Sequence, residues 1–303
     1  MEPPGNTASC LLPDGRTLDY WDGGDPSGFP VLVHPGTPGS RLFGRHLHAA
    51  AVDAGARLVV LSRPGYGGSS LLPPGLAAVA EDTLALADSL SLSRFAVLGT
   101  SGGGPNAVAT GCRAPDRVTC VGVLAGPGDV GAAGDDAETE EQARVVALLS
   151  EDPEAAMTQV RDEMAPMFDP LLALDDEALV DGFLSLVPAG PTVHSGDEHF
   201  KRYWADDLRE SLRSYDGFAR DSLSWGVPWD IDPATLARPC LLWYGDADQM
   251  VPPEHGAWLA GRVPGARLTR LPGDGHAATI LDHLPAVLAA LVDAALVDPA
   301  PTP

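Results

Sequence analysis

The 303-residue chain has the sequence of an α/β protein with a mostly parallel β-sheet flanked by helices. Short apolar runs of the kind that form buried strands alternate with helix-forming stretches over residues 31–126, and again from residue 241 onward. Parallel strands need crossover connections, so this alternation favours a parallel sheet. The length and the 45% of apolar residues are sufficient for one large core.

The first elements are expected to be a hairpin over residues 9–21 and strands over 29–33 and 57–61. The hairpin is predicted by two short apolar runs that a Pro-Asp-Gly turn separates. Each of the two strands is followed by a loop rich in Gly, Pro and Ser, at residues 34–40 and 62–70. These loops are therefore candidates for the rim of a site at the carboxyl edge of the sheet.

Residues 95–113 carry the most informative pattern of the chain. An apolar strand over 95–98 leads into Gly99-Thr100-Ser101-Gly102-Gly103, and a helix is expected over 105–113. Strand, Gly-x-Ser-x-Gly and helix in this order predict a nucleophile elbow, in which small neighbours allow a sharp turn and the serine is presented in a strained conformation. By itself the pentapeptide also fits a glycine-rich turn with an incidental serine, so its context decides.

Three more strands follow, over residues 118–125, 241–244 and 268–271, and the last helix is expected from His276 to about residue 297. The second of these strands runs into Gly245-Asp246-Ala247-Asp248-Gln249-Met250-Val251-Pro252, and the third ends just before His276. A serine, an acid and a histidine thus each lie just beyond a strand.

In this order the chain resembles the α/β-hydrolase family, whose triad runs Ser, then Asp or Glu, then His along the sequence. The resemblance implies Ser101 as nucleophile, Asp248 as acid and His276 as base. Asp129, which follows the strand over 118–125, is an alternative acid, since some relatives place the carboxylate there. The resemblance extends from about residue 10 to about residue 297 and is weakest in the middle third.

The same resemblance implies an oxyanion hole made by the backbone N–H groups of Gly102 and Thr37. Residues 34–40 are similar to the family's His-Gly-x-Pro-Gly segment, with Thr37 at the x position. Pro35 stands where the family has histidine, and His34 lies one residue earlier. His34 is accordingly expected either to brace the loop or to face the substrate pocket.

Residues 62–70 resemble the family's Arg-Pro-Gly-x-Gly-x-Ser loop, which implies a structural role in bracing the loops around the site. Residues 1–127 and 236–303 are expected to form the hydrolase core. The helical and acidic segment 128–235, which follows the sixth core strand, is expected to be an inserted cap or lid.

Half of the 18 aromatic residues lie in the expected cap, which suggests an apolar pocket wall. The alternative is that a small helical cap needs bulky residues for its own core. Trp225 and Trp229 are the candidates chosen for the pocket. The nine aromatic residues are Phe168, Phe183, Phe200, Tyr203, Trp204, Tyr215, Phe218, Trp225 and Trp229.

Composition excludes several classes of partner. With 42 acidic and 19 basic residues, the net charge of −23 opposes binding to nucleic acid and to anionic membranes. The start of the chain lacks the pattern of a signal peptide, no run of 18 apolar residues occurs, and the four cysteines are dispersed. We therefore expect a cytoplasmic protein with reduced thiols, while its oligomeric state leaves no mark in the sequence.

The triad predicts an enzyme that needs neither metal nor other cofactor, and the histidine spacings do not suggest a metal site. The leading interpretation is a serine hydrolase that cleaves an ester, thioester or amide of a small, largely apolar molecule through an acyl-enzyme on Ser101. Acyl transfer, carbon–carbon bond hydrolysis, perhydrolysis and cyclisation in secondary metabolism remain open on the same frame. A small-molecule binding protein with slow or no turnover is the alternative from a different class.

Overall fold

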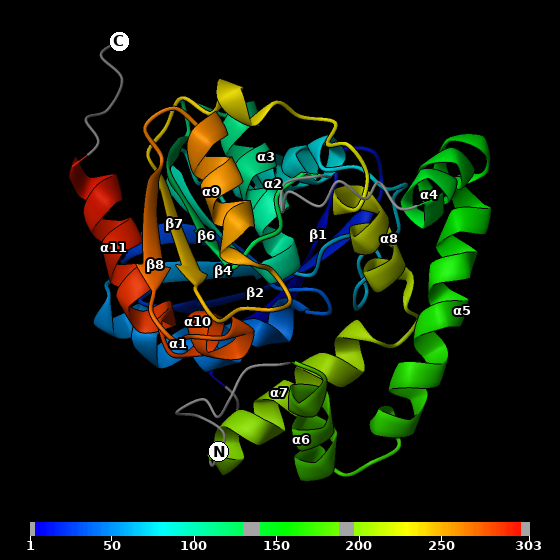
Figure 1. Ribbon diagram of the computed structural model, residues 1–303. Helices are drawn as coiled ribbons and strands as arrows, with labels where there is room; N and C mark the ends of the chain where they lie inside the picture. Colours follow the sequence, from blue (N-terminus) through cyan, green and yellow to red (C-terminus); the bar gives the residue numbers. More distant parts are fainter. Residues whose placement is uncertain (1–3, 130–139, 188–196, 298–303) are drawn as a thin grey trace.

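The computed structural model describes residues 4–129, 140–187 and 197–297. Its centre is an eight-stranded sheet in the order β1-β2-β4-β3-β5-β6-β7-β8, with β2 antiparallel to both of its neighbours and all other pairs parallel (Figure 1). The expected mostly parallel sheet flanked by helices is confirmed. The strands are β1 (Asn6–Leu11), β2 (Thr17–Gly24), β3 (Phe29–His34), β4 (Ala56–Leu61), β5 (Phe95–Thr100), β6 (Val118–Leu124), β7 (Cys240–Gly245) and β8 (Arg267–Leu271).

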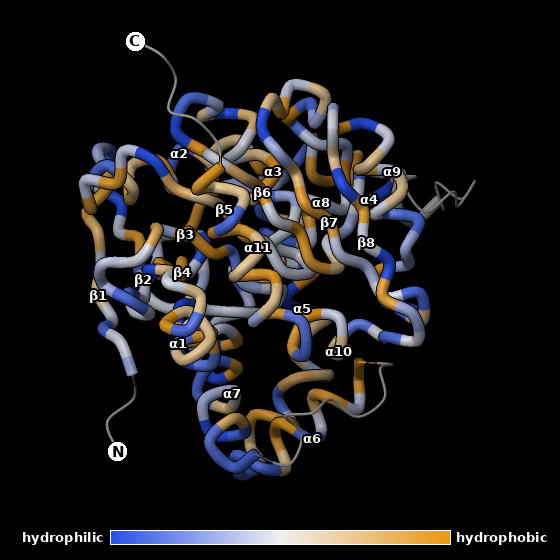
Figure 2. Tube along the Cα trace, turned by 90° about the vertical axis from the view of Figure 1, so that its left-hand side faces the viewer, coloured by the Kyte–Doolittle hydropathy of each residue, from blue (hydrophilic) through white to orange (hydrophobic). Residues whose placement is uncertain are grey.

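Helices cover both faces of the sheet, so the central strands are apolar on both sides. In β5, successive side chains enter different cores: Val97 packs in the cluster that includes α2 (Ala77–Ser89), α3 (Gly104–Arg113) and α9 (Pro253–Arg262), and Leu98 in the cluster with α1 (Gly44–Asp53) and α11 (Leu284–Val297). Apolar residues accordingly concentrate in the central strands (Figure 2). None of the described helices is both long enough and apolar enough to cross a lipid bilayer.

Between β6 and β7 the described part of the chain is helical. The expected cap also includes residues 130–139 and 188–196, which lie outside the described residues. Helix α5 lies on the outer side of the molecule, and α8 lies between α5 and the sheet (Figure 1). The helices are α4 (Glu140–Glu151), α5 (Pro153–Leu172), α6 (Asp176–Leu186), α7 (Glu198–Ser211) and α8 (Asp216–Trp225).

Part of the acidity of this segment has a local structural reason. The side chains of Asp152, Asp175 and Asp197 accept hydrogen bonds from backbone N–H groups in the first turns of α5, α6 and α7. A carboxylate at this position satisfies otherwise free donors and interacts favourably with the helix dipole. Three of the acidic residues in this segment therefore serve as helix N-caps.

The prediction of a single last helix from His276 to about residue 297 is wrong. The structure divides it into α10 (His276–Leu281) and α11 (Leu284–Val297), with Asp282 and His283 between them. Pro285 is the second residue of α11. Proline has no N–H for the carbonyl of Leu281, and its ring would clash with that carbonyl in a continuous helix.

Candidate active site

Ser101 lies in a tight turn between β5 and α3, at the carboxyl edge of the sheet. Its φ of +46° is in the left-handed region, which is strained for a residue with a side chain. The turn depends on its glycines, because a Cβ added at Gly99 would lie 2.4 Å from the carbonyl oxygen of Gly103. A Cβ at Gly103 would lie 2.1 Å from the carbonyl oxygen of His34, at the end of β3. The elbow thus presses against its neighbouring strand and holds Ser101 at the edge.

Two turns bring an acid and a histidine to this serine. His276 Nε2 lies 2.9 Å from Ser101 Oγ, and His276 Nδ1 lies 2.7 Å from Asp248 Oδ2. The other carboxylate oxygen, Asp248 Oδ1, accepts hydrogen bonds from the backbone N–H groups of Met250 and Val251, both at 2.9 Å. With its proton on Nδ1, the imidazole donates to Asp248 and leaves Nε2 free to accept the proton of Ser101. The geometry therefore suits base-assisted attack by the serine.

Asp129, the alternative acid, is hydrogen-bonded to the backbone in the segment that follows α8, whereas His276 is bonded to Asp248. Asp129 Oδ1 accepts a hydrogen bond of 3.1 Å from the backbone N–H of Trp229. Of the two carboxylates considered, Asp248 is the one bonded to His276.

The loop after β3 places Thr37 beside the elbow. The Oγ1 atom of Thr37 lies only 2.3 Å from the position a Cβ on Gly102 would occupy, so the two residues are in direct contact. Arg63 braces this loop by donating to the carbonyl oxygens of Pro35 and Gly36, at 2.5 and 2.8 Å. Thr37 and Gly102, the two expected oxyanion donors, are thus brought together next to Ser101.

His34 does not line the pocket. Its side chain is fully buried, and its Nε2 lies 3.4 Å from Thr110 Oγ1. That hydroxyl donates to the carbonyl of Asn106 and is available to accept from the imidazole. Burial, with a smaller contribution from the charge of Arg63, lowers the pKa of His34 to about 3. His34 is therefore a buried, neutral histidine whose imidazole contacts α3, which speaks against the pocket role. Its role in bracing the loop stays a prediction.

The two tryptophans expected at the pocket also lie outside its lining. Trp229 is 9% exposed and packs edge-to-face on Trp258 in the core, with ring centroids 5.5 Å apart. Trp225 lies against the elbow, its indole nitrogen 3.3 Å from the position of a Cβ on Gly102. Trp225 is the last residue of α8, and Trp229 lies in the segment that follows it, so neither of them is on α6 or α7, which supply the aromatic part of the wall.

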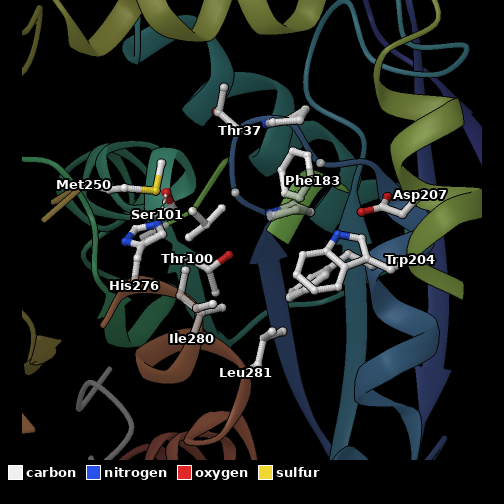
Figure 3. Close-up of a pocket in the computed structure, with 17 residues that line it drawn as sticks. Thr37, Thr100, Ser101, Phe183, Trp204, Asp207, Met250, His276, Ile280 and Leu281 are labelled. Carbon is white, nitrogen blue, oxygen red and sulfur yellow. Dashed lines mark hydrogen bonds between the residues drawn. The ribbon is translucent and has the colours of Figure 1, made fainter. Parts of the chain in front are cut away.

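A pocket of about 630 Å³, including its open mouth, contains Ser101 and His276 in its wall. Figure 3 shows these two residues and Met250 on one side, and Phe183, Trp204 and Asp207 on the other. Phe183 comes from α6, Trp204 and Asp207 from α7, and Ile280 and Leu281 from α10. The aromatic excess of the expected cap indicated Phe183 and Trp204 only as two of nine aromatic residues. No pattern in the sequence singled out Asp207, Met250 or Ile280.

Asp207 is the one carboxyl group in the pocket wall formed by described residues. Its side chain is 2% exposed, and its Oδ1 accepts from Ser40 N at 2.8 Å and from Ser40 Oγ at 2.5 Å. Burial raises the pKa of Asp207 from 3.8 to about 7, against the opposing effect of the hydrogen bonds from Ser40. The group connects α7 to Ser40, in the loop after β3 that also carries Thr37.

This pKa predicts a dependence of stability on pH. The folded state holds more protons on Asp207 than the unfolded state between about pH 4 and pH 7, so this contribution to stability is present at low pH and is lost as the pH rises through 7. The free energy of unfolding of Asp207→Asn should therefore rise relative to wild type across this window, by at most about 1.4 kcal/mol per pH unit. Urea unfolding at half-unit pH steps measures this difference.

The matched control is Asp206→Asn, which removes a half-exposed carboxylate from the same helix, where it pairs with Arg45 at 2.9 Å. It corrects for the change in net charge. Parallel stability curves for wild type and Asp207→Asn would contradict the raised pKa.

Comparison with known proteins extends these observations. A sequence model of the alpha/beta hydrolase fold matches residues 30–282. The chain is 25% identical, over 81% of its length and 80% of the relative's, to a 2-hydroxy-6-oxo-6-phenylhexa-2,4-dienoate hydrolase of Burkholderia cepacia.

Solved structures share the fold. An enol-lactonase from Burkholderia xenovorans aligns with a TM-score of 0.63 at 19% identity, covering 95% of this chain and 99% of the other. An esterase from Exiguobacterium antarcticum aligns with a TM-score of 0.65 at 18% identity and the same coverage. With the family model matching most of its length and its relatives named as hydrolases, the chain belongs to the α/β-hydrolase fold family and is a hydrolase.

Proposed function

We propose that the protein is a cofactor-independent serine hydrolase that cleaves an ester, thioester or amide of a small, largely apolar molecule. The observation that carries the proposal is the continuous hydrogen-bond chain from Ser101 Oγ through His276 to Asp248, with Ser101 and His276 in the wall of a pocket. Thr37 and Gly102 lie in contact beside the nucleophile, where an oxyanion would form.

The chemistry follows from this order of groups. Ser101 Oγ bonds to the acyl carbon while its proton moves to His276 Nε2, and the carbonyl oxygen becomes an oxyanion held by the N–H groups of Thr37 and Gly102. His276 returns the proton to the leaving group as the bond to the acyl carbon breaks. Water then attacks the acyl-enzyme with His276 as base, and Ser101 regains its proton. Asp248 orients the imidazole and stabilises its cation throughout.

The pocket favours a neutral, apolar substrate. Its described wall includes Phe183, Trp204, Ile280 and Leu281, and none of the described lining residues is Lys or Arg. An ionised Asp207 in the same wall would repel an anion. An uncharged acyl group therefore fits this lining better than a carboxylate does.

Hydrolysis of a carbon–carbon bond in a 2-hydroxy-6-oxo-dienoate is the second candidate, because curated relatives 24–25% identical to this chain are named for such substrates. These compounds are anions, and the described pocket wall has no cationic side chain to pair with their carboxylate. We therefore rank ester hydrolysis first.

The test is intact mass after exposure to a fluorophosphonate, followed by turnover of p-nitrophenyl acetate, butyrate and octanoate and of 2-hydroxy-6-oxo-6-phenylhexa-2,4-dienoate. We expect one adduct on wild type and none on Ser101→Ala or His276→Ala, with turnover of at least one ester and none of the dienoate. No adduct and no ester turnover would contradict the proposal and favour a binding protein. Turnover of the dienoate alone would favour the second candidate.

A further inference from the structure

We propose that Asp221, on the cap helix α8, is a positioning residue for the oxyanion hole and acts through Arg63 and Thr37. The inference rests on the proposed function, since it assigns a device to the same site. Among the described residues, Asp221 is not part of the pocket wall and makes no hydrogen bond to the triad, and no motif in the sequence pointed to it.

The carboxylate of Asp221 lies at the centre of a buried cluster. Asp221 and Arg63 are both fully buried, and Arg63 donates to Asp221 Oδ2 through Nη2 at 2.5 Å and through Nε at 3.0 Å. The same oxygen accepts from Thr37 Oγ1 at 2.9 Å and from the hydroxyl of Tyr66 at 3.0 Å. A buried carboxylate with this many charge-assisted donors fixes the position of each of them.

Arg63 passes this restraint to the peptide that is expected to bind the oxyanion. Its Nη2 donates to Asp221 and also to the carbonyl oxygen of Gly36, at 2.8 Å. In a trans peptide the C=O and N–H groups point in opposite directions, so holding the carbonyl of Gly36 directs the N–H of Thr37 away from Arg63. An added Cβ on Gly36 would lie 3.5 Å from the Cβ of Ser101, which places this peptide against the nucleophile. The hydrogen bond to the carbonyl also polarises the peptide and strengthens the N–H as a donor.

Helix α8 is docked so closely that Asp221 has little freedom. The N–H of Gly217 donates to the carbonyl of Gly65 at 3.2 Å, and a Cβ on Gly217 would lie 2.5 Å from the ring of Tyr66. Farther along the helix, Ser224 Oγ accepts from the N–H of Gly75 at 2.9 Å. Helix α8 is therefore fixed to the core at both of its ends.

The prediction concerns Asp221→Asn, which keeps the size of the side chain and removes its charge. An amide accepts at one oxygen only and brings an N–H₂ group toward the guanidinium, so Arg63 and Thr37 are expected to shift. We expect kcat for the best p-nitrophenyl ester to fall by about 10- to 100-fold, part of the effect of losing one oxyanion donor. KM should change less than twofold, because Asp221 does not contact substrate.

The second readout is the affinity for an alkyl boronic acid. A boronic acid forms a tetrahedral anionic adduct on Ser101 that uses the oxyanion hole, whereas binding of the intact ester does not. The affinity for the boronic acid should therefore weaken in parallel with kcat. The matched control is Ser224→Ala, which removes a buried hydrogen bond that docks the same helix. In that variant we expect a lower Tm with kcat and boronate affinity within twofold of wild type.

A second variant guards against failure of Asp221→Asn to fold. Thr37→Val keeps the backbone N–H and the side-chain shape but removes the hydroxyl that donates to Asp221, and we expect kcat to fall several-fold with KM little changed. Unchanged kcat and boronate affinity in the folded variants, or losses that Ser224→Ala shares in proportion to its Tm, would overturn the inference. If wild type itself forms no adduct and turns over no ester, the proposed function fails and this inference with it.

Discussion

Ser101→Ala is expected to lower kcat by about 10⁴-fold or more, because it removes the only hydroxyl that the described residues place in hydrogen-bond contact with His276. In the structure Nε2 of His276 is bonded to Ser101 Oγ, and alanine leaves this nitrogen without a partner on the reacting side. Steady-state turnover of the best ester measures the loss, and the absence of a fluorophosphonate adduct verifies its cause.

A glycine variant separates chemistry from folding. The backbone at Ser101, with its φ of +46°, is as strained for alanine as for serine, but glycine adopts this φ without steric strain. The free energy of unfolding of Ser101→Gly should therefore be about 1 kcal/mol higher than that of Ser101→Ala, and both variants should be inactive. Turnover within tenfold of wild type in either folded variant would exclude Ser101 as the nucleophile.

Asp248→Asn is expected to lower kcat by about 10⁴-fold, through the tautomer of the histidine. The carboxylate Oδ2 now accepts from Nδ1 of His276 at 2.7 Å, and Oδ1 is held by the N–H groups of Met250 and Val251. If the amide oxygen keeps those two backbone bonds, the amide nitrogen faces Nδ1 and donates to it. The imidazole proton then moves to Nε2, which can no longer accept from Ser101.

The matched control is Asp129→Asn, since Asp129 is the other carboxylate that the resemblance allowed. Its amide oxygen can still accept from the N–H of Trp229, so we expect kcat within threefold of wild type. The reverse pattern, full activity in Asp248→Asn and a large loss in Asp129→Asn, would transfer the role of the acid to Asp129. Tm values for both variants show whether each is folded.

The described helices between β6 and β7 contribute to the site in two distinct ways. Helices α6 and α7 supply the apolar wall opposite Ser101, through Phe183 and Trp204. Helix α8 makes no wall but holds the loop that carries Thr37, through Asp221. Changes in α6 and α7 should therefore alter substrate preference, and changes at Asp221 should alter the rate with any substrate.

Local patterns predicted the strands, the elbow and the positions of Ser101, Asp248 and His276 just beyond strands. Such features depend on a few neighbouring residues: glycines that permit the turn at Ser101, and apolar runs buried on both faces of a parallel sheet. The division between α10 and α11 is also local, and Pro285 was the signal that could have revealed it.

The sequence alone was thus sufficient to predict a mostly parallel sheet, the order of the serine, acid and histidine along the chain, and the family. Only the folded molecule shows that Asp221 meets Arg63 across 158 positions, that Asp207 faces the pocket, and that Trp229 packs on Trp258 instead. Strands and turns form according to neighbouring residues in the sequence. Which side chains of the helices between β6 and β7 reach the site depends instead on how those helices pack on core elements distant in the sequence, and no periodic pattern in the sequence encodes this packing.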